Sequence, residues 1–155
     1  MNAYKARPNR IPWPPIITLL AIALSSLAGY FFATPFPQGR AYRSVGVLIL
    51  VIVIAIDLWS ILTLRAARTT VSPTRKSTKL VTSGPFRLSR NPIYVGNVLL
   101  LLALALIFAN AWFILFALLT ALCIQKFAVE REEQHLLAVF GAEYETYCRR
   151  VRRWL

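Results

Sequence analysis

The sequence predicts an all-α membrane protein with four transmembrane helices, a helical hairpin formed by the last two, and a cytoplasmic helical tail at the C-terminus. Three observations predict this class. The chain of 155 residues is 57% hydrophobic, its apolar residues fall into long blocks, and its basic residues lie between these blocks. A soluble helical pair is disfavoured, because so small a chain could not cover four apolar faces with polar surface. The length predicts one domain, residues 1–155.

The first two apolar blocks are long enough to cross a bilayer. Residues 16–33 contain no charge, and residues 44–64 carry one acid, Asp57. Roughly 18 to 20 apolar residues match the hydrocarbon thickness at about 1.5 Å per residue. The first block follows basic residues, as the apolar region of a secretory signal peptide does. However, Ala28-Gly29-Tyr30 is followed by two phenylalanines rather than by a small-residue cleavage site. We therefore expect this block in the mature protein.

The third and fourth apolar blocks are residues 93–108 and 111–128, separated by Asn110. The third is short, roughly 24 Å as a helix. We expect the two to form a helical hairpin that turns at Asn110. The remaining segments are a loop at 65–92 and a polar tail at 129–155.

The basic residues predict the orientation, since Lys and Arg accumulate on the cytoplasmic side. They precede the first block, fill the 65–92 loop and the tail, and are absent from the Asn110 turn. Arg40 and Arg43 lie in the short loop after the first block. Both termini are therefore expected in the cytoplasm, which agrees with four crossings. The net charge of +12 suits anionic headgroups, and nucleic acid is not an expected partner because the bases flank the spans rather than forming one patch. The residues are Lys5, Arg7, Arg10, Arg40, Arg43, Arg65, Arg68, Arg75, Lys76, Lys79, Arg87, Arg90, Lys126, Arg131, Arg149, Arg150, Arg152 and Arg153.

Asp57 lies eight residues before Arg65, so it is buried about 12 Å below the cytoplasmic end. An acid at that depth is costly and suggests a role with substrate. The alternative is a hydrogen bond to a neighbouring helix, or snorkelling toward the interface. Neither a disulfide nor a metal site is expected, because Cys123 and Cys148 lie on different sides and His135 is the only histidine. We expect His135 to be solvated on a polar helix.

The loop ends in a segment with turn and helix-start chemistry. Gly84-Pro85 marks a turn. Asn91-Pro92 begins a helix, because Asn can accept from a first-turn amide and Pro suits the first helical position. Tyr94 then lies one turn inside, and Gly96 allows another helix or a ligand to approach. Such a helix start suits a carboxylate, although a well-capped span with arginine anchors explains the same residues.

The tail carries five of the six acids in the protein. The range 130–140 predicts a helix, and Gly141 is a natural stop in the left-handed region. A second short helix would carry Tyr144, Tyr147 and Val151 on one face. The alternative is a solvated amphipathic tail lying on the membrane.

Together, these two segments resemble the signatures of the isoprenylcysteine carboxyl methyltransferase family, with the phosphatidylethanolamine methyltransferases as a wider relation. Leu80 to Phe86 and Arg90 to Gly96 resemble the first signature. Glu132-Glu133, Phe140-Gly141, the tyrosines at 144 and 147 and the ending Val151 to Leu155 resemble the second. Both occur in order, separated by a hairpin of the right length, and the resemblance covers about residues 65–155.

The resemblance implies a membrane methyltransferase that binds S-adenosylmethionine at the cytoplasmic ends of the hairpin. Asn91 stands where the family usually has His, Phe86 where it usually has Tyr, and Ala128 where the prenylcysteine enzymes have an Arg for the substrate carboxylate. The resemblance therefore identifies the family rather than the acceptor. The resemblance also implies, by matching positions, which residues bind the cofactor: Lys79, Leu80, Val81, Phe86, Asn91, Pro92, Ile93, Tyr94 and Glu132.

Methyl transfer from a sulfonium is an in-line displacement, so positioning and exclusion of water supply much of the rate. No covalent nucleophile or metal is required. Arg90 suits the carboxylate of the cofactor. Glu133 and Asp57 are the candidate bases if the acceptor is an amine. The expected acceptor is a lipophilic carboxylate, amine or thiol that enters sideways from the bilayer.

Two other functions remain open. One is a membrane reductase of the sterol type, which would bind NADPH. The other is a non-catalytic membrane scaffold that binds neither S-adenosylmethionine nor NADPH. A homodimer is one arrangement open to a bundle this small.

Overall fold

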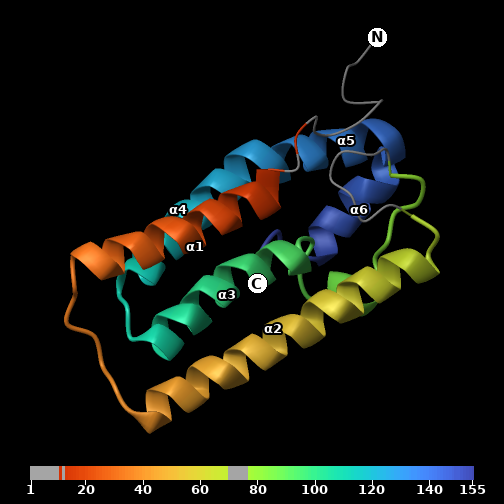
Figure 1. Cartoon of the computed structure of the whole chain (residues 1–155). Helices are drawn as coiled ribbons and strands as arrows, with labels where there is room; N and C mark the ends of the chain where they lie inside the picture. Colours follow the sequence, from red (N-terminus) through yellow and green to blue (C-terminus); the bar gives the residue numbers. More distant parts are fainter. Residues whose placement is uncertain (1–10, 12, 70–76) are drawn as a thin grey trace.

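The computed structural model describes residues 11, 13–69 and 77–155, and these residues contain helices and no strand, as predicted. Five of the basic residues used for the orientation, Lys5, Arg7, Arg10, Arg75 and Lys76, lie outside the described residues. In chain order the elements are α1 (Trp13–Phe31), α2 (Arg40–Ala66), the 3-10 turn η2 (Gly84–Arg87), α3 (Pro92–Phe108), α4 (Trp112–Ile124), the π-helical turn η3 (Gln125–Val129), α5 (Glu130–Phe140) and α6 (Ala142–Arg150) (Figure 1).

Three helical segments of the described chain are long and apolar enough to cross a membrane. They are α1, α2 and the continuous helix Trp112–Phe140, which joins α4, η3 and α5. The helix α3 is apolar but has 17 residues, which is short for a full crossing. The last apolar helix does not break after the predicted span at 111–128 but continues through η3 into α5, where a helix was predicted over 130–140. A fourth crossing stays a prediction.

The helices α2 and α3 pack antiparallel through two glycines. A Cβ atom on Gly46 would lie 2.8 Å from the carbonyl oxygen of Ala103, and one on Gly96 would lie 2.5 Å from Oδ1 of Asp57. Neither site has room for a methyl group, so the glycines allow the backbones to approach closely. The predicted close approach at Gly96 is confirmed, and the element that approaches is α2.

The hairpin of α3 and α4 turns at Asn110 as predicted. The Asn110 amide donates to the Ser25 carbonyl oxygen at 3.0 Å, and its Oδ1 accepts from the Trp112 backbone N–H at 3.0 Å. The first bond fastens the turn to α1, and the second stabilises the turn itself. The core between α1, α3 and α4 consists of Ala21, Leu101, Ala105, Phe113 and Ala117.

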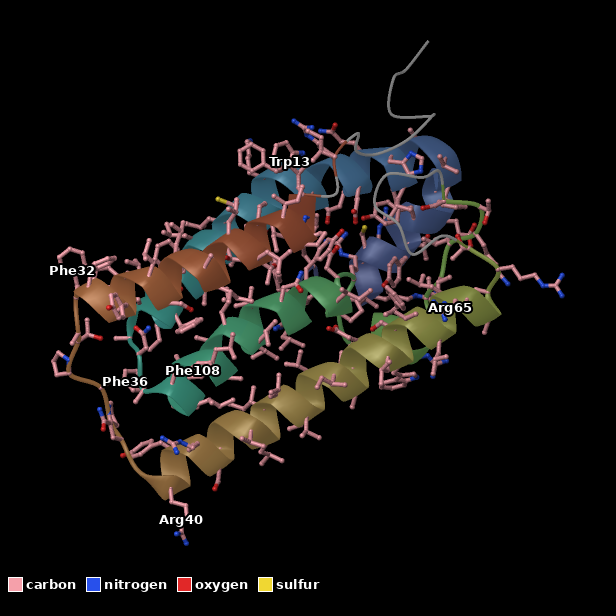
Figure 2. The ribbon with its side chains drawn as sticks, viewed as in Figure 1. Trp13, Phe32, Phe36, Arg40, Arg65 and Phe108 are labelled. Atoms are coloured by element: carbon pink, nitrogen blue, oxygen red, sulfur yellow. The ribbon has the colours of Figure 1, made fainter. Side chains whose placement is uncertain are left out.

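One end of the bundle gathers the polar segments: the start of α1, the end of α2, η2, the start of α3, and α5 with α6 (Figure 1). We call this the polar end. Figure 2 shows Trp13 and Arg65 toward it, and Phe32 and Arg40 toward the opposite end. Apart from Arg40 and Arg43, the described basic residues belong to segments at the polar end.

The tail folds back on the bundle rather than lying free. Its first helix ends at Gly141, whose φ of 52° is positive as predicted, although its ψ of −124° lies outside the left-handed helical region. Tyr144 and Tyr147 of α6 are only 4% and 7% exposed. Val151 lies just past the helix in extended conformation. The solvated amphipathic tail, the alternative at the sequence level, is therefore wrong.

The π-helical turn η3 sets the direction of the α5 side chains. Ala128 and Val129 in this turn are fully buried with Ile124, and they pack against Tyr94 and Trp154. A π turn holds one residue more than an α turn, so it rotates the following residues by about 100° relative to α4. This rotation decides which side chains of α5 face the bundle.

Candidate functional site

A cavity of about 370 Å³ lies at the polar end, with walls from α1, α2, the loop before η2, α3, α5 and α6. Its volume falls in the range of small-molecule sites, roughly 300–1,000 Å³. Arg90 and Glu133 line it, and Asp57 does not. Their functional roles stay predictions. All the residues predicted for cofactor binding line this cavity: Lys79, Leu80, Val81, Phe86, Asn91, Pro92, Ile93, Tyr94 and Glu132.

A hydrogen bond joins Tyr94 to Glu132 on the cavity wall. The phenol donates to Oε1 of the carboxylate at 2.5 Å, and both residues are half-buried. Within the described residues Glu132 forms no ion pair. The carboxyl group therefore has no basic side chain paired with it among the described residues, and it lines a space of ligand size.

Glu133, by contrast, lies between two guanidinium groups. Arg153 donates from Nε to Oε1 at 2.9 Å and from Nη2 to Oε2 at 2.6 Å. Nη2 of Arg90 lies 3.3 Å from Oε1. The hydrogen bond with Glu133 raises the pKa of Arg153. Both carboxylate oxygens are thus held by guanidinium groups, and Glu133 joins α5 to Arg90 and to the end of the chain.

Arg90 also contacts the face of α6 that carries the buried tyrosines. Its Nη1 donates to the Tyr144 hydroxyl at 3.5 Å and to the sulfur of Cys148. Its Nε atom is buried and has no hydrogen-bond partner among the described residues. Burial, and then the charge of Glu133, raises the pKa of Tyr144. Burial raises that of Tyr147, so both phenols stay neutral around the cavity.

Asn91 makes a different bond from the predicted one. Its side chain does not cap α3 but donates to the carbonyl oxygen of Arg153 at 2.9 Å. The Ser89 hydroxyl donates to the same oxygen at 3.2 Å and accepts from the Asn91 backbone N–H at 3.0 Å. The Arg90 backbone N–H donates to the Arg152 carbonyl at 2.9 Å. The end of the chain is thus bound to the start of α3, and it carries the Arg153 guanidinium to Glu133.

The loop wall of the cavity has backbone groups open to a ligand. The N–H groups of Thr78 and Lys79 donate to Oγ1 of Thr69 at 3.2 and 3.4 Å. Within the described part of the chain, the N–H groups of Leu80 and Val81 form no hydrogen bond. Half-buried backbone amides need partners, and a ligand in the cavity could supply them.

The prediction that His135 is solvated is wrong. It is 1% exposed rather than solvated, it lines the cavity, and its Nε2 accepts from the Ser77 backbone N–H at 3.2 Å. The sequence contained a signal for this position. Glu132, His135 and Leu136 are spaced i, i+3 and i+4, which places them on one helix face, and all three line the cavity.

Asp57 lies outside the cavity, one turn below Ile61, which lines it. Its Oδ1 is buried beside Gly96 and has no hydrogen-bond partner among the described residues. The hydrogen bond to a neighbouring helix, considered as an alternative role, is therefore absent at this oxygen.

The apolar wall contributed by the first two helices was not identified from the sequence. It comes from Pro14 and Pro15 of α1 and from Ile61 and Leu64 of α2. These residues sit in ordinary apolar runs, so no local signal separates them from lipid-facing neighbours. The cavity therefore combines a polar wall from the tail with an apolar wall from the spans.

Similarity to known proteins covers the same segments. A family model described as phospholipid methyltransferase matches residues 42–143, from α2 into α6. An uncharacterized protein of Haemophilus influenzae is 40% identical over 63 residues, which make up 41% of this chain and 100% of that protein. The nickel-cobalt-cadmium resistance protein NccN of Alcaligenes xylosoxydans xylosoxydans is 39% identical over 79 residues, 50% of this chain and 36% of that protein.

Proposed function

Because the chain belongs to the phospholipid methyltransferase family, we propose that it transfers a methyl group from S-adenosylmethionine to a lipophilic acceptor at the cytoplasmic face of a membrane. Its family makes it a membrane methyltransferase, and three helices are apolar and long enough to cross a membrane. The observation that supports the rest is the convergence of the Glu132 carboxyl group, which has no ion-pair partner among the described residues, open loop amides and an apolar wall on one cavity.

The polar wall fits the proposed donor. When bound, S-adenosylmethionine supplies a methyl group on a positively charged sulfur. The carboxyl group of Glu132 can bind a cation, and the N–H groups of Leu80 and Val81 can donate to a polar ring edge. Arg90, whose Nε lacks a partner among the described residues, can bind a carboxylate.

The apolar wall fits a lipophilic acceptor. Pro14 and Pro15 face the cavity from α1, and Ile61 and Leu64 face it from α2. Both helices are candidate membrane spans, so we infer that the acceptor enters sideways from the bilayer. Position 128, where the prenylcysteine enzymes have an Arg, is a fully buried alanine in this chain. It therefore supplies no cation for an acceptor carboxylate.

The protein contributes orientation and a dry environment rather than a covalent nucleophile. Tyr94 fixes Glu132, and the Glu133–Arg153 pair fixes the end of the chain over the start of α3. If the acceptor is an amine, Asp57 is the remaining candidate to accept its proton, because Glu133 is held by two arginines. That role requires the acceptor's amine to reach below Ile61.

We also propose four crossings with both termini in the cytoplasm. The described bases concentrate at the polar end, and the opposite end carries Arg40 and Arg43. Positive charge favours the cytoplasmic side. In this arrangement α3 crosses as part of the hairpin with α4, and the cavity faces the cytoplasm, where the proposed donor is available.

The test is calorimetric titration of the detergent-purified protein with S-adenosylmethionine, S-adenosylhomocysteine and NADPH. Binding of the first two that Glu132→Ala abolishes, and Glu130→Ala retains, supports the proposal. Glu130 is a matched control, because it belongs to the same helix, pairs with Lys126 on the surface and lies outside the cavity. Binding of NADPH alone would indicate a reductase, and no binding by a folded sample would indicate a scaffold.

A further inference from the structure

The residues Ser77 to Val81 are hydrogen-bonded to the end of α2 and to α5 at the polar end, and we call them the bridge segment. On one side Thr69 at the end of α2 accepts from the N–H groups of Thr78 and Lys79. The Thr78 hydroxyl donates to the Arg68 carbonyl at 3.2 Å. The bridge segment is therefore anchored at α2.

On the other side the bridge segment is anchored at α5 by His135. Nε2 of this side chain accepts from the Ser77 N–H at 3.2 Å across 58 residues of sequence. In this bond the backbone N–H is the donor and the ring nitrogen Nε2 is the acceptor. With 1% exposure, His135 is shielded from water, which makes this bond stronger than a surface bond.

The two anchors fix the part of the loop that has open backbone groups. Leu80 and Val81 follow directly after the anchored residues, line the cavity and form no backbone hydrogen bond in the described chain. Their direction depends on how the preceding three residues are held. His135 therefore acts on the ligand site through the backbone of the bridge segment.

We propose that His135 is a positioning residue of the donor site: it holds the bridge segment against α5, so that the backbone of Leu80 and Val81 is presented to the bound methyl donor. The identity of that donor rests on the proposed function, whereas the anchoring does not. The competing explanation is that His135 only fills space between α5 and the loop. An apolar side chain of similar size would then serve equally well.

A matched pair of variants separates the two explanations. His135→Leu fills the space without an acceptor, and His135→Gln places an amide oxygen near the position of Nε2. Hydrogen exchange of the ligand-free proteins measures the anchoring at residues 77–81. A peptide covering Phe113 to Thr120 of α4, which contains buried core residues, reports whether the bundle remains folded.

We expect His135→Leu to speed exchange of the bridge segment about tenfold and to weaken binding of S-adenosylhomocysteine about tenfold, the scale of one lost hydrogen bond. His135→Gln should stay within about threefold of the parent protein in both measurements. The exchange of the α4 peptide should not change. If the Leu variant fails to fold, His135→Asn, whose amide is one methylene shorter, replaces it with the same expectation.

Unchanged exchange and unchanged binding in His135→Leu would overturn the proposal. Weaker binding without faster exchange would also overturn it, because His135 would then contact the ligand rather than position the loop. Equal damage from Gln and Leu would show that shape, not the acceptor, matters. If the parent protein binds neither S-adenosylmethionine nor S-adenosylhomocysteine, the proposed function fails, while the exchange comparison still decides whether His135 anchors the loop.

Discussion

The hydroxyl of Tyr94 donates a 2.5 Å hydrogen bond to Oε1 of Glu132 and so joins the first turn of α3 to α5. The hairpin between these residues leaves the polar end and returns to it. The bond therefore fastens both ends of the hairpin at the place proposed for the donor. It also directs a carboxylate that has no ion-pair partner among the described residues toward the cavity.

The first prediction concerns the charge of Glu132. Glu132→Gln keeps the size of the side chain and removes its charge, so it should weaken S-adenosylmethionine binding by about 10- to 100-fold, the scale of a hydrogen bond to a charged group. The loss should be smaller for S-adenosylhomocysteine, which carries no positive sulfur. Calorimetry with both ligands measures the difference. Equal losses would mean that the carboxylate does not act on the sulfonium.

The second prediction concerns Tyr94. Tyr94→Phe removes the donor but retains the ring and the Glu132 charge, so it should weaken binding less than Glu132→Gln, by about tenfold at most. The double variant should lose little beyond Glu132→Gln alone, because the two residues act as one unit. A fully additive loss in the double variant would show that they act separately.

The third prediction concerns the contact of Gly96 with Asp57. Gly96→Ala places a methyl group where Oδ1 of Asp57 lies, so it should destabilise the α2–α3 packing by about 1–3 kcal/mol. Asp57→Ala removes the obstructing atoms and should recover part of this loss in the double variant. Thermal unfolding in detergent measures the coupling. No coupling would place the strain of Gly96→Ala elsewhere along α2.

The fourth prediction compares the partners of one ion pair. Glu133→Gln leaves two guanidinium groups near each other without a carboxylate, and should cost about 2 kcal/mol of stability. Arg153→Gln should cost no more than about 1 kcal/mol, because Arg153 is 36% exposed and its pairing is screened by solvent. Unfolding temperatures of the two variants test the order. The reverse order would indicate that Arg90 alone cannot hold Glu133.

The fifth prediction concerns alkaline pH. Burial raises the pKa of Tyr144 and Tyr147 above the usual value of 10.0. Above pH 10.0 the unfolded chain releases these protons while the folded chain keeps them, so the stability they contribute is complete below that pH and falls as the pH rises. Tyr147→Phe should lower stability by about 1 kcal/mol at neutral pH, because the 2.7 Å bond to the Phe86 carbonyl is lost. The variant should also lose less stability between about pH 8 and about pH 11. A parallel decline would exclude Tyr147 as a cause.

Local chemistry in the sequence predicted much of the helical layout. Gly84-Pro85, Asn110 and Gly141 each mark a change of direction through their own backbone or side-chain properties, and all three changes are present. Asn91 and His135 were misjudged because their hydrogen-bond partners, Arg153 and Ser77, lie 62 and 58 residues away in the sequence. The neighbouring residues could not indicate those partners. The face that α5 turns to the bundle also depends on η3, and no pattern in the sequence identified this π turn.

The π-helical turn has a consequence at the level of the gene. Loss of a single codon within Gln125–Val129 would remove none of the side chains on the cavity wall. It would nevertheless convert the turn to ordinary α-helix and rotate everything downstream by about 100°. Glu132 would turn away from Tyr94, and His135 from the bridge segment. The number of residues in this turn, rather than their identity, therefore sets the direction in which the α5 side chains point at the site.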